Sequence, residues 1–280
     1  MNRSLRPLFL IAPAAMLIGV FLILPYLNII VMSFRAPAQS TPYGLGFSTE
    51  SYARFFSDSY YIRALAQTLW LGLATTAICL VLGFPVALQI ARSTARWRGI
   101  LYGLTLSPLL VGIVVRSFGW TILLGNNGVI NRGLRELGLI GAPLPLMYNS
   151  FGIVVALAHV FLPFMILPIL SALQLVDPAL ENAARSLGAS RMTVFRRIVL
   201  PLALPGVQSG VILVFVLAVS AYVTPMLVGG MRVKTMAMIV VDTLLDQFQW
   251  PLGSALALML SLATAAAVLV FVSLTRVRWR

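Results

Sequence analysis

The 280-residue chain is 60% hydrophobic, carries only 10% charged residues and has a mean hydropathy of +0.98. Soluble domains usually carry about 25% charged residues, so this composition excludes an ordinary soluble protein and indicates an integral membrane protein. The net charge of +13 comes from 19 arginines and one lysine, most of them in short segments beside apolar runs. That distribution is typical of membrane-topology signals and argues against a nucleic-acid-binding protein.

Six apolar runs are long enough to cross a bilayer as helices. They cover residues 8–33, 65–91, 100–124, 150–175, 203–228 and 252–275. The sequence therefore predicts an all-α integral membrane protein with six transmembrane helices and a single transmembrane domain over residues 1–280. We expect the first run to be a retained helix, because it is longer than the roughly 7–15 apolar residues of a cleaved signal peptide.

The basic residues predict the orientation of these spans, because cytoplasmic loops carry an excess of arginine. Twelve lie on the side of both termini: Arg3, Arg6, Arg92, Arg96, Arg98, Arg185, Arg191, Arg196, Arg197, Arg276, Arg278 and Arg280. Seven lie on the other side: Arg35, Arg54, Arg63, Arg132, Arg135, Arg232 and Lys234. We therefore predict that both termini and the segment 177–201 are cytoplasmic.

Arg116 is the one charged residue inside an apolar run. A charge at this depth costs at least about 2.5 kcal/mol on insertion scales, so its side chain should face protein or water. Two interpretations stay open. Arg116 is either a gate or a pairing partner for a second membrane subunit, or it is a packing residue that binds a carboxylate or a backbone carbonyl.

None of the seven acidic residues lies centrally in a predicted span, so a cationic solute would need other partners along the membrane. Aromatic faces and amides could serve through cation–π contacts, and the candidates are Trp120, Asn126 and Tyr222. Asp242 and Asp246 in an outer loop could attract cations, although a solvated loop is the commoner account of such residues. The single histidine, His159, suits a helix–helix hydrogen bond better than a ligand site. We expect neither a metal site nor catalytic groups.

The segment 177–201 is amphipathic and rich in arginine. Helical spacing predicts an apolar stripe for a protein partner, formed by Ala183, Ala184, Leu187, Met192, Phe195 and Val199. Gly188 predicts a bend between two short helices. The alternative is an amphipathic helix that lies on the lipid surface, with its arginines on anionic head groups.

This segment resembles the cytoplasmic EAA loop of ABC-importer permease subunits, whose pattern is E-A-A, three residues, Gly, nine residues and I-x-L-P. Matching positions are Ala183, Ala184, Gly188, Ile198, Leu200 and Pro201. The pattern's Glu position holds Asn182, and Glu181 stands one residue earlier. The resemblance implies a coupling helix that docks into a groove on an ATPase subunit.

The wider resemblance, over roughly residues 50–275, is to spermidine/putrescine-type permeases, specifically the first of two permease chains. It rests on Leu162-Pro163-Phe164-Met165, Asp177-Pro178, Thr224-Pro225 and Gly229-Gly230. It implies a bacterial inner-membrane importer with a second permease subunit, two copies of a cytoplasmic ABC ATPase and a periplasmic or lipid-anchored substrate-binding protein. ATP and magnesium would bind the ATPase and not this chain, which has no G-x-x-x-x-G-K-[ST] sequence.

Other solutes stay open, because related permeases carry opines or aminophosphonates. A stand-alone secondary transporter is a weaker alternative, since it should show inverted repeats and carboxylates inside the membrane, and neither is evident here.

Overall fold

The computed structural model describes residues 13, 16–38 and 41–275. The predicted cytoplasmic termini, including Arg3, Arg6, Arg276, Arg278 and Arg280, lie outside these residues. Every named element in the described part is helical, and one isolated antiparallel bridge joins Arg35 and Phe47. The predicted all-α fold is confirmed.

The chain divides into two compact units. Of the described residues, the first unit joins those up to Arg63 to Met236–Ala263, and the second joins Ala64–Thr235 to those from Thr264 onward. Helices that lie in the first unit are η1 (Gly19–Ile23), α2 (Leu24–Ser33), α3 (Glu50–Ser57), α12 (Met236–Val241) and η5 (Asp242–Asp246). Two helices pass from one unit into the other, namely α4 (Ser59–Arg92) and α13 (Trp250–Thr275).

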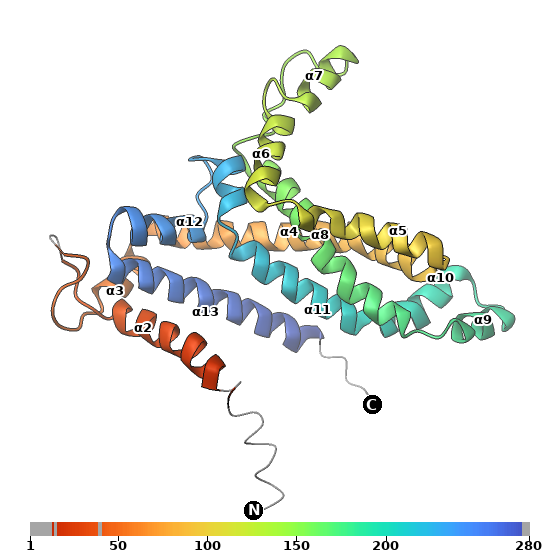
Figure 1. Cartoon of the computed structure of the whole chain (residues 1–280), viewed down its shortest axis with the longest axis horizontal. Coiled ribbons are helices and arrows are strands. Elements are labelled where there is room, and N and C mark those ends of the chain that lie inside the picture. Colours follow the sequence, from red (N-terminus) through yellow and green to blue (C-terminus); the bar gives the residue numbers. More distant parts are fainter. Residues whose placement is uncertain (1–12, 14–15, 39–40, 276–280) are drawn as a thin grey trace, which may run out of the picture. The chain divides into compact units, whose positions relative to one another are not determined.

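The second unit holds the remaining helices, and Figure 1 labels the α-helices among them. In chain order they are α5 (Ala95–Leu106), η2 (Ser107–Leu110), α6 (Ile113–Leu124), α7 (Val129–Glu136), α8 (Ser150–Gln174), α9 (Pro178–Ser186), α10 (Arg191–Val194), η3 (Phe195–Val199), α11 (Leu200–Val219) and η4 (Pro225–Gly229).

Five helical stretches are long and apolar enough to span a membrane: Met16–Ser33, Ser59–Arg92, Ser150–Gln174, Arg191–Val219 and Trp250–Thr275. A sixth span exists only if Ala95–Leu110 and Ile113–Glu136 are counted together, and these two stretches meet at 95°. The predicted span over 100–124 is therefore interrupted by a bend in the structure. The helix tightens into the 3₁₀ turn η2 around Pro108 and breaks at Gly112, and α6 then leaves the direction of α5 (Figure 1).

The helix that contains most of the fifth predicted span, 203–228, lies earlier in the chain than predicted. The helix begins earlier, at Arg191, and ends at Val219. Pro225 has no N–H to donate to the turn before it, and the backbone at Ala221 and Tyr222 is not helical. Apolar composition alone could not locate these ends, because the run stays apolar across the break.

Much of the core of the second unit lies where α8 packs against α11. Small residues allow this close approach. A Cβ added at Gly206 would lie 2.5 Å from the carbonyl oxygen of Pro168 and 2.6 Å from Cβ of Ala172. Gly210 approaches Met165 in the same way. The two helices therefore form a tightly packed pair onto which the segment 177–201 is attached.

Candidate functional site

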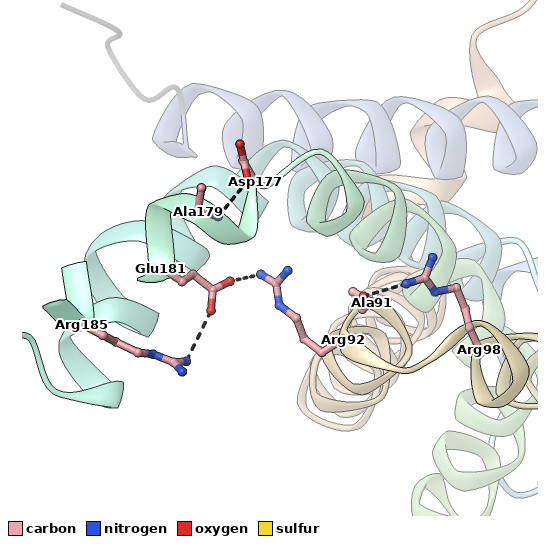
Figure 2. Close-up of polar contacts among 7 residues, drawn as sticks. All are labelled: Ala91, Arg92, Arg98, Asp177, Ala179, Glu181 and Arg185. Carbon is pink, nitrogen blue, oxygen red and sulfur yellow. Dashed lines mark hydrogen bonds and ion pairs between the residues drawn. The ribbon is translucent and has the colours of Figure 1, made fainter. Parts of the chain in front are cut away.

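Helix α9 forms the first half of the segment 177–201. Its start is fixed by Asp177, whose side chain accepts a hydrogen bond of 2.8 Å from the backbone N–H of Ala179 (Figure 2). Pro178 occupies the first helical position, where its missing N–H costs nothing. The sequence Asp-Pro therefore begins a helix at this point.

Gly188 ends α9 in a Schellman motif. The N–H of Ala189 donates to the carbonyl of Ala184 at 3.0 Å, and the N–H of Gly188 donates to the carbonyl of Arg185 at 2.9 Å. Gly188 has a φ of +86°, a conformation that L-residues rarely adopt, and a Cβ built on it would meet nothing within 4 Å. The backbone conformation, and not lack of space, requires glycine here.

The second half of the segment is the beginning of a spanning helix. Ser190 caps it by accepting a hydrogen bond of 3.2 Å from the N–H of Thr193. From there α10, η3 and α11 continue without a break from Arg191 to Val219. The prediction of two short helices is thus corrected to one short helix, a glycine turn and the first turns of a span.

The predicted apolar stripe does not form one exposed face. Val199 is only 3% exposed, and Ala184 packs against the chain's own core. Phe195 makes an edge-to-face contact with Phe84, with ring centroids 5.7 Å apart. Leu187 and Met192 remain accessible, at 89% and 59% exposure. The surface available to a partner is therefore narrower than the sequence pattern suggested.

Of the other positions that match the EAA pattern, Ala183 and Pro201 are exposed, and Ile198 and Leu200 are half-buried. Ile198 packs against the core of the second unit. These residues belong to the first turns of the spanning helix or to α9, so the matched pattern covers both arms of the glycine turn.

Glu181 joins α9 to the end of α4. Its carboxylate forms an ion pair with Arg92 and a second one, at 3.6 Å, with Arg185 one turn along α9 (Figure 2). The Glu181 side chain is only 12% exposed, whereas its neighbour Asn182 is exposed. Successive residues of a helix point about 100° apart, so the one-residue displacement of the glutamate from its expected position turns it toward α4.

No pattern in the sequence indicated the pair of Arg92 and Glu181, because 89 positions separate its partners. The only hint in the sequence was that the glutamate of the EAA pattern stands at Glu181 and not at position 182. A carboxylate displaced by one residue on a helix faces a different neighbour.

The structure places Arg116 on α6, just after the bend. Its Nη2 donates to the carbonyl oxygen of Val111 at 2.6 Å, inside the break between η2 and α6. Nε and Nη1 have no hydrogen-bond partner among the described residues. One turn farther along α6, Nε1 of Trp120 donates to Nδ1 of His159 on α8 at 3.3 Å. The predicted interhelical hydrogen bond of His159 is therefore present.

The remaining pathway candidates do not gather around Trp120 through any hydrogen bond or ring contact that the structure shows. Asn126 is exposed in the turn after α6, and Tyr222 is half-buried at the break after α11. Asp242 and Asp246 bound η5 in the first unit, where Asp242 accepts a hydrogen bond of 2.9 Å from the side chain of Gln247. Their proposed contact with a solute stays a prediction.

A protein family and several curated relatives match most of this chain. Residues 6–278 match the family model described as "Binding-protein-dependent transport system inner membrane component". The spermidine/putrescine transport system permease protein PotB of Haemophilus influenzae is 31% identical over 255 residues, covering 90% of this chain and 87% of that protein. PotB of Escherichia coli K12 is 32% identical over 251 residues, covering 90% of this chain and 91% of that protein.

Solved structures show the same fold. A chain of a bacterial ABC transporter involved in import of the acidic polysaccharide alginate superposes with a TM-score of 0.81 at 17% identity, covering 99% of both chains. A chain of the bacterial alginate ABC transporter in complex with an alginate pentasaccharide-bound periplasmic protein gives a TM-score of 0.77 at 19% identity, covering 98% of this chain and 95% of that one.

Proposed function

Because this chain belongs to the family of binding-protein-dependent transport system inner membrane components, we propose that it forms half of the substrate pathway of an ATP-driven polyamine importer. It is a multi-pass protein of the bacterial inner membrane, and its relatives are permease subunits. The proposed partners are a second permease chain, two copies of a cytoplasmic ABC ATPase that binds ATP and magnesium, and a substrate-binding protein outside the membrane.

The observation that carries the substrate class is the similarity to PotB along 90% of the chain. A permease of this class need not hold a strong cation site itself if the separate binding protein selects the solute. The absence of carboxylates from the predicted spans is compatible with that division of labour. Trp120 and Tyr222 remain the candidates for contacts with a passing cation.

The geometry of the segment 177–201 supports its role as the coupling element. Helix α9 contacts α10 and η3, and these continue into the spanning helix α11. The ion pair between Glu181 and Arg92 connects α9 to α4 as well. A displacement of α9 by the ATPase would therefore reach two spanning helices, and ATP binding could shift the pore between two conformations.

Reconstitution tests this proposal. The chain is co-expressed with the transport genes next to it, purified by a tag on this chain and placed in proteoliposomes with the binding protein outside. We expect uptake of labelled spermidine or putrescine that requires both the binding protein and internal ATP, with internal ADP as the control. Uptake of an opine or an aminophosphonate in place of polyamines would show that the proposed substrate class is wrong while the importer function holds. Uptake without any ATPase would refute the importer itself.

A further inference from the structure

The segment 177–201 has no free carboxylate. Asp177 caps the start of α9, and Glu181 is engaged by Arg92 and Arg185. Three further arginines of the segment are exposed, and their side chains form no hydrogen bond or ion pair with any described residue: Arg191, Arg196 and Arg197. The segment 177–201 therefore carries positive charge that no acidic residue of the segment neutralises.

Part of this charge converges on a cavity of about 430 Å³ between the end of α4, α9 and the first turns of the spanning helix. Its charged lining consists of the three arginines Arg92, Arg185 and Arg191 against the single carboxylate of Glu181. Asn182 also lines it. Its apolar lining is Leu88, Pro178, Val194, Phe195 and Val199. A cavity with an excess of guanidinium groups favours an anionic group such as a carboxylate.

Helix stability does not account for Arg191. It is the first residue of the helix that runs to Val219, where the partial positive charge of the helix dipole disfavours a cation. Its side chain is exposed and has no acidic partner among the residues that the structure describes. The guanidinium of Arg191 is therefore available to an anion from outside the chain.

We propose that an acidic side chain of the ATPase subunit enters this basic cavity and pairs with Arg185 and Arg191. This inference rests on the proposed function and adds the charge of the docking surface to it. A protein carboxylate is favoured over a lipid head group because α9, which forms one wall, is also the helix that resembles an ATPase-docking element. The exposed side chains of Leu187 and Met192 offer apolar contact beside the cavity. The ATPase groove should therefore be acidic opposite the cavity and apolar beside it.

The test removes the positive charge of Arg191. The complex is purified by a tag on this chain, the co-purifying ATPase is identified by mass spectrometry, and its retention is measured across a salt titration. Arg191→Gln should weaken ATPase binding by about three- to tenfold and flatten its salt dependence, whereas Arg191→Lys should retain most of it.

The matched control is Arg132→Gln, which removes an exposed arginine on α7, on the opposite side in the predicted topology. Equal yield and elution volume of all variants guard against misfolding. ATPase binding by Arg191→Gln that equals binding by the control would overturn the inference. So would unchanged ATPase retention with loss of co-purifying phosphatidylglycerol, which would assign the cavity to lipid. If the unmodified chain retains no ATPase, the proposed function fails as well.

Discussion

Replacing Gly188 should disturb coupling through the backbone conformation alone. The residue has a φ of +86° and open space around its missing side chain, so no steric clash would confuse the result. An L-residue in the left-handed region costs about 1–2 kcal/mol. A free-energy change of this size lowers the population of the native turn, relative to competing conformations, by a factor of about 5–30.

Three substitutions of Gly188 should reduce transport by different amounts. Gly188→Asn should be close to the unmodified protein, because asparagine tolerates the left-handed conformation. Gly188→Ala should bear the full cost, and Gly188→Val should be worse, because β-branched residues are true outliers at positive φ. The order of transport rates should therefore be glycine, asparagine, alanine and valine.

The assay is ATP-driven polyamine uptake into proteoliposomes, with ATP hydrolysis measured in the same samples. Uptake per ATP hydrolysed should fall in the alanine and valine variants, while binding of the solute by the separate binding protein should not change. Unchanged uptake in Gly188→Val with the ATPase still bound would refute the coupling role of this turn and favour the lipid-surface interpretation. An asparagine variant as poor as valine would show that backbone conformation is not the cause.

Three further outcomes are expected. Arg116→Leu should alter transport while the complex still assembles if Arg116 acts in the pathway, and Arg116→Lys should preserve part of it; a variant that no longer assembles, judged by size-exclusion chromatography, would assign Arg116 to packing. Gly206→Ala should destabilise the complex in a thermal melt, because the new Cβ would lie 2.5 Å from a carbonyl oxygen of α8, whereas Gly99→Ala, with nothing within 4 Å, should not lower the melting temperature. Cysteine at Arg191 should react with a membrane-impermeant reagent only from inside and cysteine at Arg132 only from outside, with little background because native Cys79 is buried; labelling of position 191 from outside would reverse the predicted topology.

The fold class, the family resemblance and the glycine turn could be predicted from composition and residue spacing alone. Apolar runs about 20 residues long identify an all-α membrane protein, because only helices satisfy every backbone group within one segment in lipid. The order of Ala183, Ala184, Gly188 and Pro201 indicated the permease resemblance, and the family match bears it out. The requirement for glycine at position 188 could also be anticipated, since a helix stop is encoded locally.

The tertiary structure decided the directions of the helices and which residues contact one another. Hydropathy records that the run 100–124 is apolar but not that Pro108 and Gly112 turn the chain by 95° within it. Helical spacing placed Ala184, Phe195 and Val199 on one stripe but could not say that this stripe faces the chain's own core. The ion pair of Glu181 with Arg92 depends on two helices meeting across 89 positions of sequence. Such contacts arise only when distant segments pack, because a local pattern specifies which faces of a helix are apolar or charged but not what lies against them.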